Sequence, residues 1–156
     1  MRRDSRLSRV LHVLIHMDRH CKRATSETIS KMLDTNAVVV RRTMAGMREL
    51  GYVRSVSGHG GGWELTRSLE DLTLFDVYRG VGEPPLFAIG PPEDHPECLV
   101  AQAVDAALEE AMQEAQARLL SRFRGITVAQ LAADFDARYA TVSQLPEMDC
   151  PSGKSY

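Results

Sequence analysis

The feature that most constrains the fold is a helical pattern that runs directly into a glycine-rich hairpin. Val40, Met44 and Met47 recur at the i, i+4, i+7 spacing of one buried helical face, while arginines occupy other faces. Gly51 follows the last periodic residue, where a helix end needs a residue that tolerates positive φ. The pattern predicts a helix over 36–50 with one buried face and a basic exposed surface.

The residues after this helix predict a hairpin. Residues 52–56 are rich in strand-forming side chains, and residues 63–65 can form the returning strand. Four glycines lie within 58–62, so the tip can approach another backbone closely. A helix of groove-filling width beside a small glycine-tipped hairpin is suited to reading nucleic acid.

Charge is divided unevenly along the chain. Residues 1–67 carry 13 Lys and Arg against 6 Asp and Glu, a net charge of +7. Residues 68–156 carry 6 against 15, a net charge of −9. Because a positive surface gains affinity for phosphate by releasing counterions, the first part is expected to bind DNA. Two ordinary charged surfaces are the alternative explanation.

Two shorter helical patterns precede the central helix. The first has an apolar stripe, and the second begins at a capping Thr25 or Ser26 and carries its apolar side chains between 29 and 33. A turn at 34–36 leads into the helix over 36–50 and completes a helix-turn-helix. The stripe of the first helix consists of Leu7, Val10, Leu11, Leu14 and Ile15.

The second helix of a helix-turn-helix presents its first residues to base edges. Hydroxyl and amide groups can bond bases or phosphates, valine can contact a thymine methyl, and arginine can pair with guanine or phosphate. The alternative for Val38 and Val39 is that they pack inward. We expect the DNA-binding residues to be Ser26, Thr35, Asn36, Val38, Val39, Arg41, Arg42, Arg48, Arg54, His59, Gly60 and Gly61.

Four runs of residues resemble the Rrf2 family of bacterial winged-helix transcription regulators, and the likeness covers most of 3–139. The resemblance implies a homodimer that binds an operator, with the helix over 36–50 in the major groove and the wing at the minor groove. Many relatives carry arginine at the wing tip where this chain has His59, so the resemblance does not assign minor-groove insertion to that residue. The matching runs are 35–42, 47–53, 55–65 and 72–79.

A long uninterrupted helix is predicted after these runs. Residues 99–120 contain neither proline nor glycine, and an apolar line follows one face. At 1.5 Å per residue this helix is about 33 Å long, so it projects beyond a small domain and is expected to pair with its copy. The alternative is a helix packed wholly on its own subunit. The expected interface residues are Val100, Val104, Leu108 and Ala111.

The predicted fold class is mainly α, a winged helix-turn-helix domain with a long C-terminal dimerisation helix. A last helix is expected to be capped by Thr127. The predicted divisions are a DNA-binding domain over 1–82, a proline-rich linker over 83–98, the dimerisation and last helices over 99–140, and a disordered tail over 141–156.

Three dispersed cysteines, Cys21, Cys98 and Cys150, do not form a disulfide framework and indicate a reducing compartment. Several Rrf2 relatives bind an iron–sulfur cluster through three cysteines in the loop before the long helix. This loop holds only Cys98, so no typical four-ligand cluster is expected. A reactive thiol and an inert buried cysteine are the other interpretations of Cys98. An unusual cluster would have to be completed by His12, His95, Glu97 or a partner subunit.

Three histidines, His12, His16 and His20, stand four residues apart on what we expect to be the polar side of the first helix. Such spacing can ligate a metal, although histidines on a solvated helix face are commoner. The sequence therefore assigns no metal and no cofactor.

Membrane and enzyme classes are disfavoured. No apolar run approaches the roughly 20 residues needed to cross a bilayer, and no secretory cleavage signature is present, so a cytoplasmic protein is expected. The glycine-rich tip lacks the ending of a P-loop, and no catalytic set stands out.

The sequence therefore indicates a transcriptional regulator that binds a double-stranded operator as a homodimer. We expect it to act as a repressor and to respond to oxidants through Cys98. The alternative function is that of a winged-helix protein-interaction module without sequence-specific DNA binding.

Overall fold

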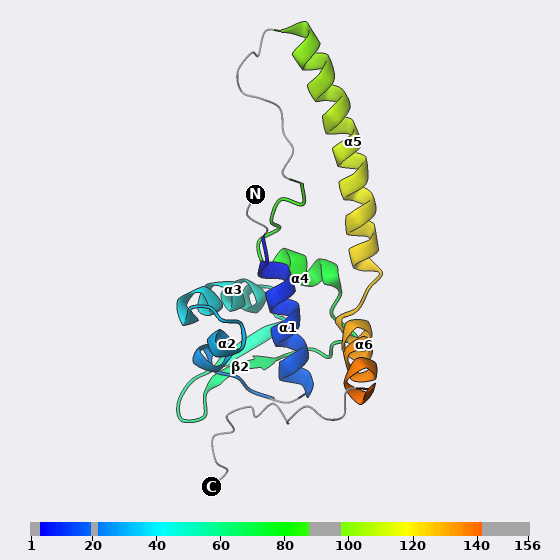
Figure 1. Cartoon of the computed structure of the whole chain (residues 1–156). Coiled ribbons are helices and arrows are strands. Elements are labelled where there is room, and N and C mark those ends of the chain that lie inside the picture. Colours follow the sequence, from blue (N-terminus) through cyan, green and yellow to red (C-terminus); the bar gives the residue numbers. More distant parts are fainter. Residues whose placement is uncertain (1–3, 20–21, 88–97, 142–156) are drawn as a thin grey trace.

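The structure is a computed structural model that describes residues 4–19, 22–87 and 98–141. The mainly helical class, with a winged helix-turn-helix followed by a long helix, is confirmed (Figure 1). None of the described helices is both long and apolar enough to cross a membrane. In chain order the elements are α1 (Arg6–Arg19), α2 (Ser26–Met32), α3 (Ala37–Glu49), β1 (Val53–Val56), β2 (Gly62–Leu65), α4 (Leu74–Gly80), α5 (Leu99–Arg124) and α6 (Val128–Thr141).

The helix α1 lies at the centre of the domain, in contact with α3, α4, α6 and β2. Its deepest apolar side chains are Val10, Val13, Leu14 and Met17, each at most 3% exposed. The predicted stripe is therefore correct at Val10 and Leu14 but misses Val13 and Met17. Because α1 is covered from several sides, its buried arc is wider than that of a helix with one neighbour. The other stripe residues are only partly buried, and they are Leu7, Leu11 and Ile15.

The sequence pattern predicted that His16 lies on the polar side of α1, and this prediction is wrong. His16 is buried, at 8% exposure, whereas His12 one turn earlier is exposed. The wide buried arc of α1 explains the difference, since it extends past the apolar stripe to include this imidazole. His20 lies outside the described residues.

The helix-turn-helix is built from two capped helices. Thr25 begins α2, where its Oγ1 accepts a hydrogen bond from the amide of Thr28 at 3.0 Å. Asn36 begins α3, where its Oδ1 accepts from the amide of Val38 at 2.7 Å. Such caps stabilise a helix by about 1 kcal/mol each. Between the two helices the chain turns at Asp34, whose φ is 46°. The predicted buried face of α3 is confirmed at Val40, Met44 and Met47.

The wing is tied to the body by a short stretch of backbone pairing. The amide of Ala24 donates to the carbonyl of Trp63 at 3.1 Å, and the amide of Trp63 donates back to Ala24 at 2.8 Å. Gly62 has a φ of 150°, and a Cβ there would lie 2.7 Å from the carbonyl oxygen of Ala24. Glycine at this position therefore serves the close approach of the wing to its own domain.

An ionised carboxylate joins the start of the wing to α4. The Tyr52 hydroxyl donates to Asp76 Oδ1 at 2.7 Å, and the Thr73 amide donates to Asp76 Oδ2 at 2.9 Å. Burial raises the pKa of Asp76, but the hydrogen bonds from Thr73 and Tyr52 outweigh it and hold the pKa below its ordinary value. Asp76 also completes the capping box that begins α4.

Helices α3 and α4 cross with their backbones close together at Gly46 and Gly80. A Cβ on Gly46 would meet the carbonyl oxygen of Gly80, and a Cβ on Gly80 would meet the side chain of Met47. Neither position therefore has room for a side chain at this separation. Because α4 also packs on α5, the crossing connects the helix-turn-helix to the long helix.

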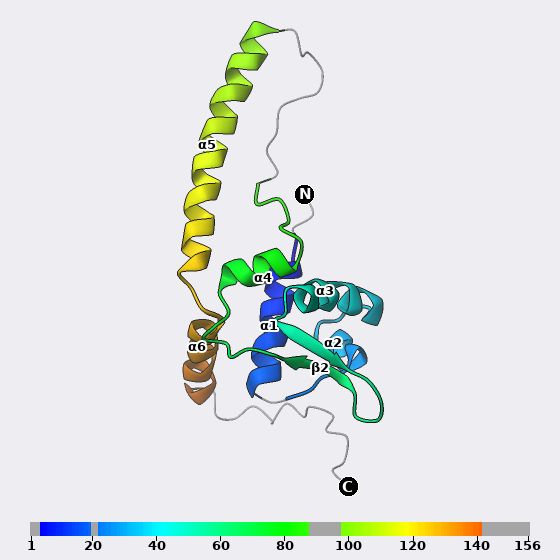
Figure 2. The same ribbon diagram turned by 180° about the vertical axis from the view of Figure 1, so that it is seen from behind.

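The long helix α5 extends away from the body of the domain (Figures 1 and 2). Its 26 residues span about 39 Å, and none of them is buried, so it is not packed wholly on its own subunit. It ends at Arg124, beyond the predicted end at Leu120, because its last turn packs on α4. The Phe123 ring meets Tyr78 edge-on at 6.1 Å, and the Arg124 guanidinium lies 3.9 Å from the Phe75 ring centroid.

The last helix begins where the sequence predicted. The backbone amide of Gln130 donates to Thr127 Oγ1 at 3.3 Å, and the side-chain oxygen Oε1 of Gln130 accepts from the backbone amide of Thr127 at 3.0 Å. α6 then packs beside α1. Most of the predicted linker over 83–98, and the predicted tail from residue 142 onward, lie outside the described residues.

Replacing Gly46 with alanine tests the close crossing. Although alanine is the better helix former, Gly46→Ala is expected to lower the free energy of unfolding by about 1–3 kcal/mol, the usual cost of overpacking. Gly125→Ala is the control, because the nearest heavy atom to a Cβ there is 3.6 Å away, and its effect should stay within about 0.5 kcal/mol. Urea denaturation measures both. Equal stability of the two variants and the unmodified chain would contradict the constrained crossing.

Candidate nucleic-acid interface

The first turns of α3 present an exposed surface of mixed chemistry. Val38 and Val39 are 61% and 47% exposed, so they do not pack into the core as the alternative supposed. Arg41 and Arg42 follow them and are also exposed. Methyl groups beside guanidinium groups are the combination that can contact a thymine methyl and an adjacent guanine or phosphate.

The two polar residues before α3 already have structural partners. The Oδ1 atom of Asn36 caps the helix, as described above. Thr35 Oγ1 lies 3.4 Å from Arg9 Nη1, a long hydrogen bond from α1. Both residues therefore hold the start of α3 in position, whatever further contacts they make.

An open groove lies between the wing and the helices α2 and α3. The wing and these two helices are on the same side of the domain (Figure 2). The wing tip turns tightly at its end, where the Gly61 amide donates to the Gly58 carbonyl at 2.9 Å. The walls of the groove include the basic side chain of Arg41 and the exposed wing-tip residues His59 and Gly60. It brings together five of the residues predicted to bind DNA: Ser26, Arg41, His59, Gly60 and Gly61.

Ser26 has a second role that the sequence did not reveal. Its Oγ accepts a hydrogen bond from the indole Nε1 of Trp63 at 2.9 Å. Trp63 is 7% exposed, so this bond lies at the edge of the core. It fixes the returning strand of the wing against the first residue of α2.

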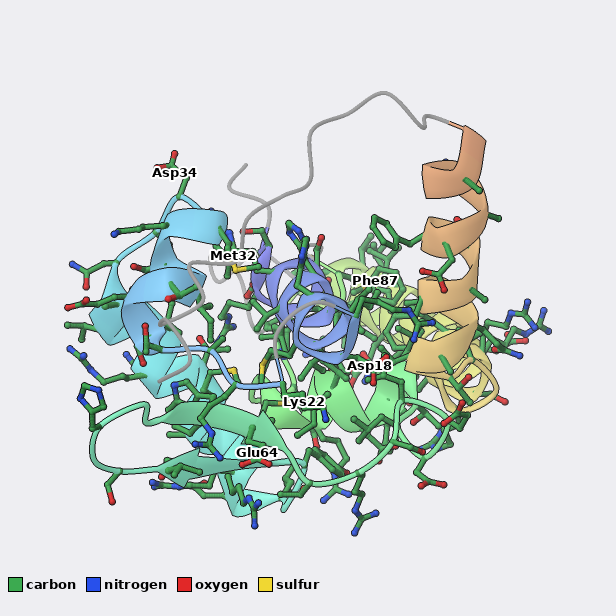
Figure 3. All side chains as sticks on the ribbon, turned by 90° about the horizontal axis from the view of Figure 1, so that it is seen from below. Asp18, Lys22, Met32, Asp34, Glu64 and Phe87 are labelled. Carbon is green, nitrogen blue, oxygen red and sulfur yellow. The ribbon has the colours of Figure 1, made fainter. Side chains whose placement is uncertain are left out.

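A cluster of two arginines and one glutamate supports the wing from the side. Glu64 Oε1 lies 3.2 Å from Arg54 Nη2, and Glu64 Oε2 lies 3.2 Å from Arg23 Nη2. Arg23 also donates to the carbonyl of Gly60 at 3.2 Å. Hydrogen bonds from Arg54 and then Arg23 hold the pKa of Glu64 below its ordinary value, so this carboxylate is ionised at neutral pH. Figure 3 shows Glu64 on the hairpin beside the segment that carries Lys22.

Sequence reasoning missed Arg23 as a residue of this site. Its only signal was its contribution to the positive charge of the first 67 residues. Its contact with Gly60 depends on the pairing of Ala24 with Trp63, which no local pattern indicates. Seven of the twelve predicted residues do not line the groove, although four of these seven are exposed on α3. They are Thr35, Asn36, Val38, Val39, Arg42, Arg48 and Arg54.

Comparison with known proteins identifies the architecture. The family model Rrf2, described as an iron-dependent transcriptional regulator, matches residues 3–134. The chain belongs to the Rrf2 family. It is 33% identical over 116 residues to YwnA of Bacillus subtilis (strain 168), which carries the name of an HTH-type transcriptional regulator, and the match covers 72% of this chain and 84% of YwnA. The Rrf2 resemblance of the sequence is therefore confirmed.

Solved structures share the Rrf2 fold described above. A transcriptional regulator from Lactobacillus plantarum superposes with a TM-score of 0.71 at 22% identity, covering 89% of this chain and 95% of that one. T. potens IscR gives 0.61 at 15% identity, covering 94% and 93%. CymR of B. subtilis, described as the global cysteine regulator, gives 0.54 at 17% identity, covering 85% and 97%. At these identities the likeness shows the fold alone.

Within the part of this Rrf2 chain that the structure describes, the side chains do not fit a typical iron–sulfur site. Clusters of that kind are held by four protein ligands, whereas the described residues contain no group of three or more His, Cys, Asp or Glu side chains that could hold a metal. Cys98 is an exposed free thiol at the N-cap of α5, so it is not an inert buried cysteine. His12 lies on α1, far from the start of α5 within one chain (Figure 1), and His95 lies outside the described residues.

Proposed function

We propose that this Rrf2 protein is a sequence-specific repressor that binds a double-stranded DNA operator as a homodimer. The observation that carries the proposal is the groove in which Arg41 of α3 faces the exposed wing tip at His59 and Gly60. The net charge of +7 over residues 1–67 supports it, since neutralising phosphates releases counterions. The names of the relatives, which are transcriptional regulators, support the same class.

The proposed mechanism divides the interface by chemistry. The start of α3 enters the major groove, which is about 12 Å wide and admits a helix, so that Val38, Val39 and Arg42 reach base edges. The wing tip lies at the minor groove. Arg54 and Arg48 contact phosphates, which fixes the register of the protein without reading sequence. Occupancy of the operator then excludes the transcription machinery.

The proposed dimer uses the exposed apolar line on α5. Val100, Val104 and Leu108 are 73%, 52% and 44% exposed, which leaves large apolar side chains in water along one helix face. Pairing with a second copy of α5 would remove this surface from water. The small side chain of Ala111 allows the two helices to approach closely. A dimer of this kind would set the distance between two copies of α3.

Two arginine substitutions test the division of roles. Arg42→Ala is expected to reduce discrimination between the DNA upstream of the gene and an unrelated duplex by about 1–3 kcal/mol, because a bidentate arginine–guanine contact is lost. Arg54→Ala should weaken binding to both duplexes alike and lower the slope of log affinity against log salt by about 1. Fluorescence anisotropy at several salt concentrations measures both effects.

Arg118→Ala is the matched control for these substitutions, because Arg118 is exposed on α5 and pairs only with Glu114 among the ion pairs described. Its affinity for both duplexes should match that of the unmodified chain. Equal losses on both duplexes in Arg42→Ala would show that the assigned role is wrong. Binding by the unmodified chain that does not distinguish the upstream DNA from the unrelated duplex would favour the protein-interaction module instead.

A charge placed in the apolar line tests the dimer. Val104→Asp is expected to dissociate or destabilise the dimer, because an unpaired carboxylate would enter an apolar interface. Ala106→Asp adds the same charge on the opposite face of α5 and should leave the dimer intact. Sedimentation equilibrium measures the mass of each variant. A dimer mass for Val104→Asp as stable to dilution as that of the control would refute the interface.

The exposed thiol at the start of α5 supports a redox-responsive form of this regulator. Oxidation of Cys98 would add bulk and polarity where α5 begins, and thereby alter the spacing of the two DNA-reading domains. Peroxide is expected to weaken operator binding by the unmodified chain, whereas Cys98→Ser should bind equally with and without peroxide. Equal affinity in all four measurements would show that Cys98 is not the sensor.

A further inference from the structure

The contact between α1 and α6 contains a pair of imidazoles that DNA binding does not use. His12 and His16 stand one turn apart on α1, and their ring centroids are 4.6 Å apart with the planes tilted by 49°. Histidines at i and i+4 on one helix face can bind one metal ion between them. The pair therefore meets the first geometric requirement of a chelating site.

A cavity opens beside this pair. It has a volume of about 110 Å³ and is lined by His12, Ile15, His16 and Phe135, the last of these from α6. A metal ion held by two imidazoles needs further ligands, and a space of this size next to polar groups accommodates water molecules. The site thus supplies both nitrogen ligands and room for the remaining coordination positions.

The two imidazoles differ in a way that suits such a site. His16 is buried and packs 6.4 Å from the Phe135 ring, so its orientation is fixed before any ligand arrives. His12 is exposed and can adjust to complete the chelate. One turn further along, Arg19 pairs with both Asp18 and Asp136, a cluster with a net charge of −1 that favours an approaching cation.

We propose that His12 and His16 bind one divalent transition-metal ion of the class that prefers imidazole nitrogen, with water in its remaining positions. Zinc is the representative ion, since it binds neutral imidazole readily and keeps water in open positions. The site is separate from the DNA-binding groove and needs no cysteine. A bound ion links two turns of the central helix beneath α6, and stabilises the folded chain because the unfolded chain lacks the preformed pair.

Isothermal titration of the full tag-free chain with zinc chloride, after treatment with a chelator, tests the proposal. His12→Ala is expected to weaken the tightest zinc affinity by about tenfold or more, because one of two protein ligands is lost. His16→Gln should weaken it comparably while keeping a polar side chain at the buried position. His59→Ala and Cys98→Ser are the controls, since they remove another exposed imidazole and the exposed thiol, and both should bind zinc as the unmodified chain does.

Thermal unfolding gives a second readout that does not depend on heat of binding. Zinc should raise the unfolding midpoint of the unmodified chain and of both controls, and should not raise that of His12→Ala. Because His12 is exposed, its replacement should leave the far-ultraviolet circular dichroism spectrum unchanged. Undiminished zinc affinity in His12→Ala, loss in only one of the two histidine variants, or loss in Cys98→Ser would each overturn the proposal.

Discussion

Helices α3 and α4 approach each other so closely at Gly46 and Gly80 that neither position has room for a side chain, and this crossing connects the helix-turn-helix to the long helix. The inner face of α3 is buried against α1, while its other side meets α4 without intervening side chains. Phe123 and Arg124 at the end of α5 pack on aromatic rings of α4. The exposed face of α3 therefore has a fixed orientation relative to the long helix. The proposed dimer, in which paired α5 helices space two copies of α3, requires this kind of rigid connection.

The wing depends on a second set of non-local contacts. Backbone pairing between Ala24 and Trp63 is possible only because Gly62 lacks a side chain, and Arg23 then reaches the wing tip at Gly60. Glu64 lies between two arginines and offsets part of their charge. The groove is therefore shaped by residues near the end of α1 and on β2 as much as by α3.

The sequence predicted the parts of the fold that local patterns determine. The buried face of α3, the positive φ of Gly51, the cap at Thr127 and the long helix all follow from periodicity and capping chemistry. It could not predict the burial of His16 or the roles of Arg23 and Ser26, because these depend on which distant segments meet. The exposure of Val38 and Val39 was likewise ambiguous in the sequence, since a valine after a helix start suits either a core or a DNA interface.

We propose that one rigid unit, α3 with its wing, reads DNA and that paired α5 helices set the distance between two such units. Hydroxyl-radical footprinting of the DNA upstream of the gene distinguishes this arrangement from binding by a single unit. Two protected segments are expected on the same face of the duplex, with their centres separated by about 34 Å, one helical turn of DNA, or by a multiple of it. A single protected segment, or protection spread evenly along the duplex, would contradict it.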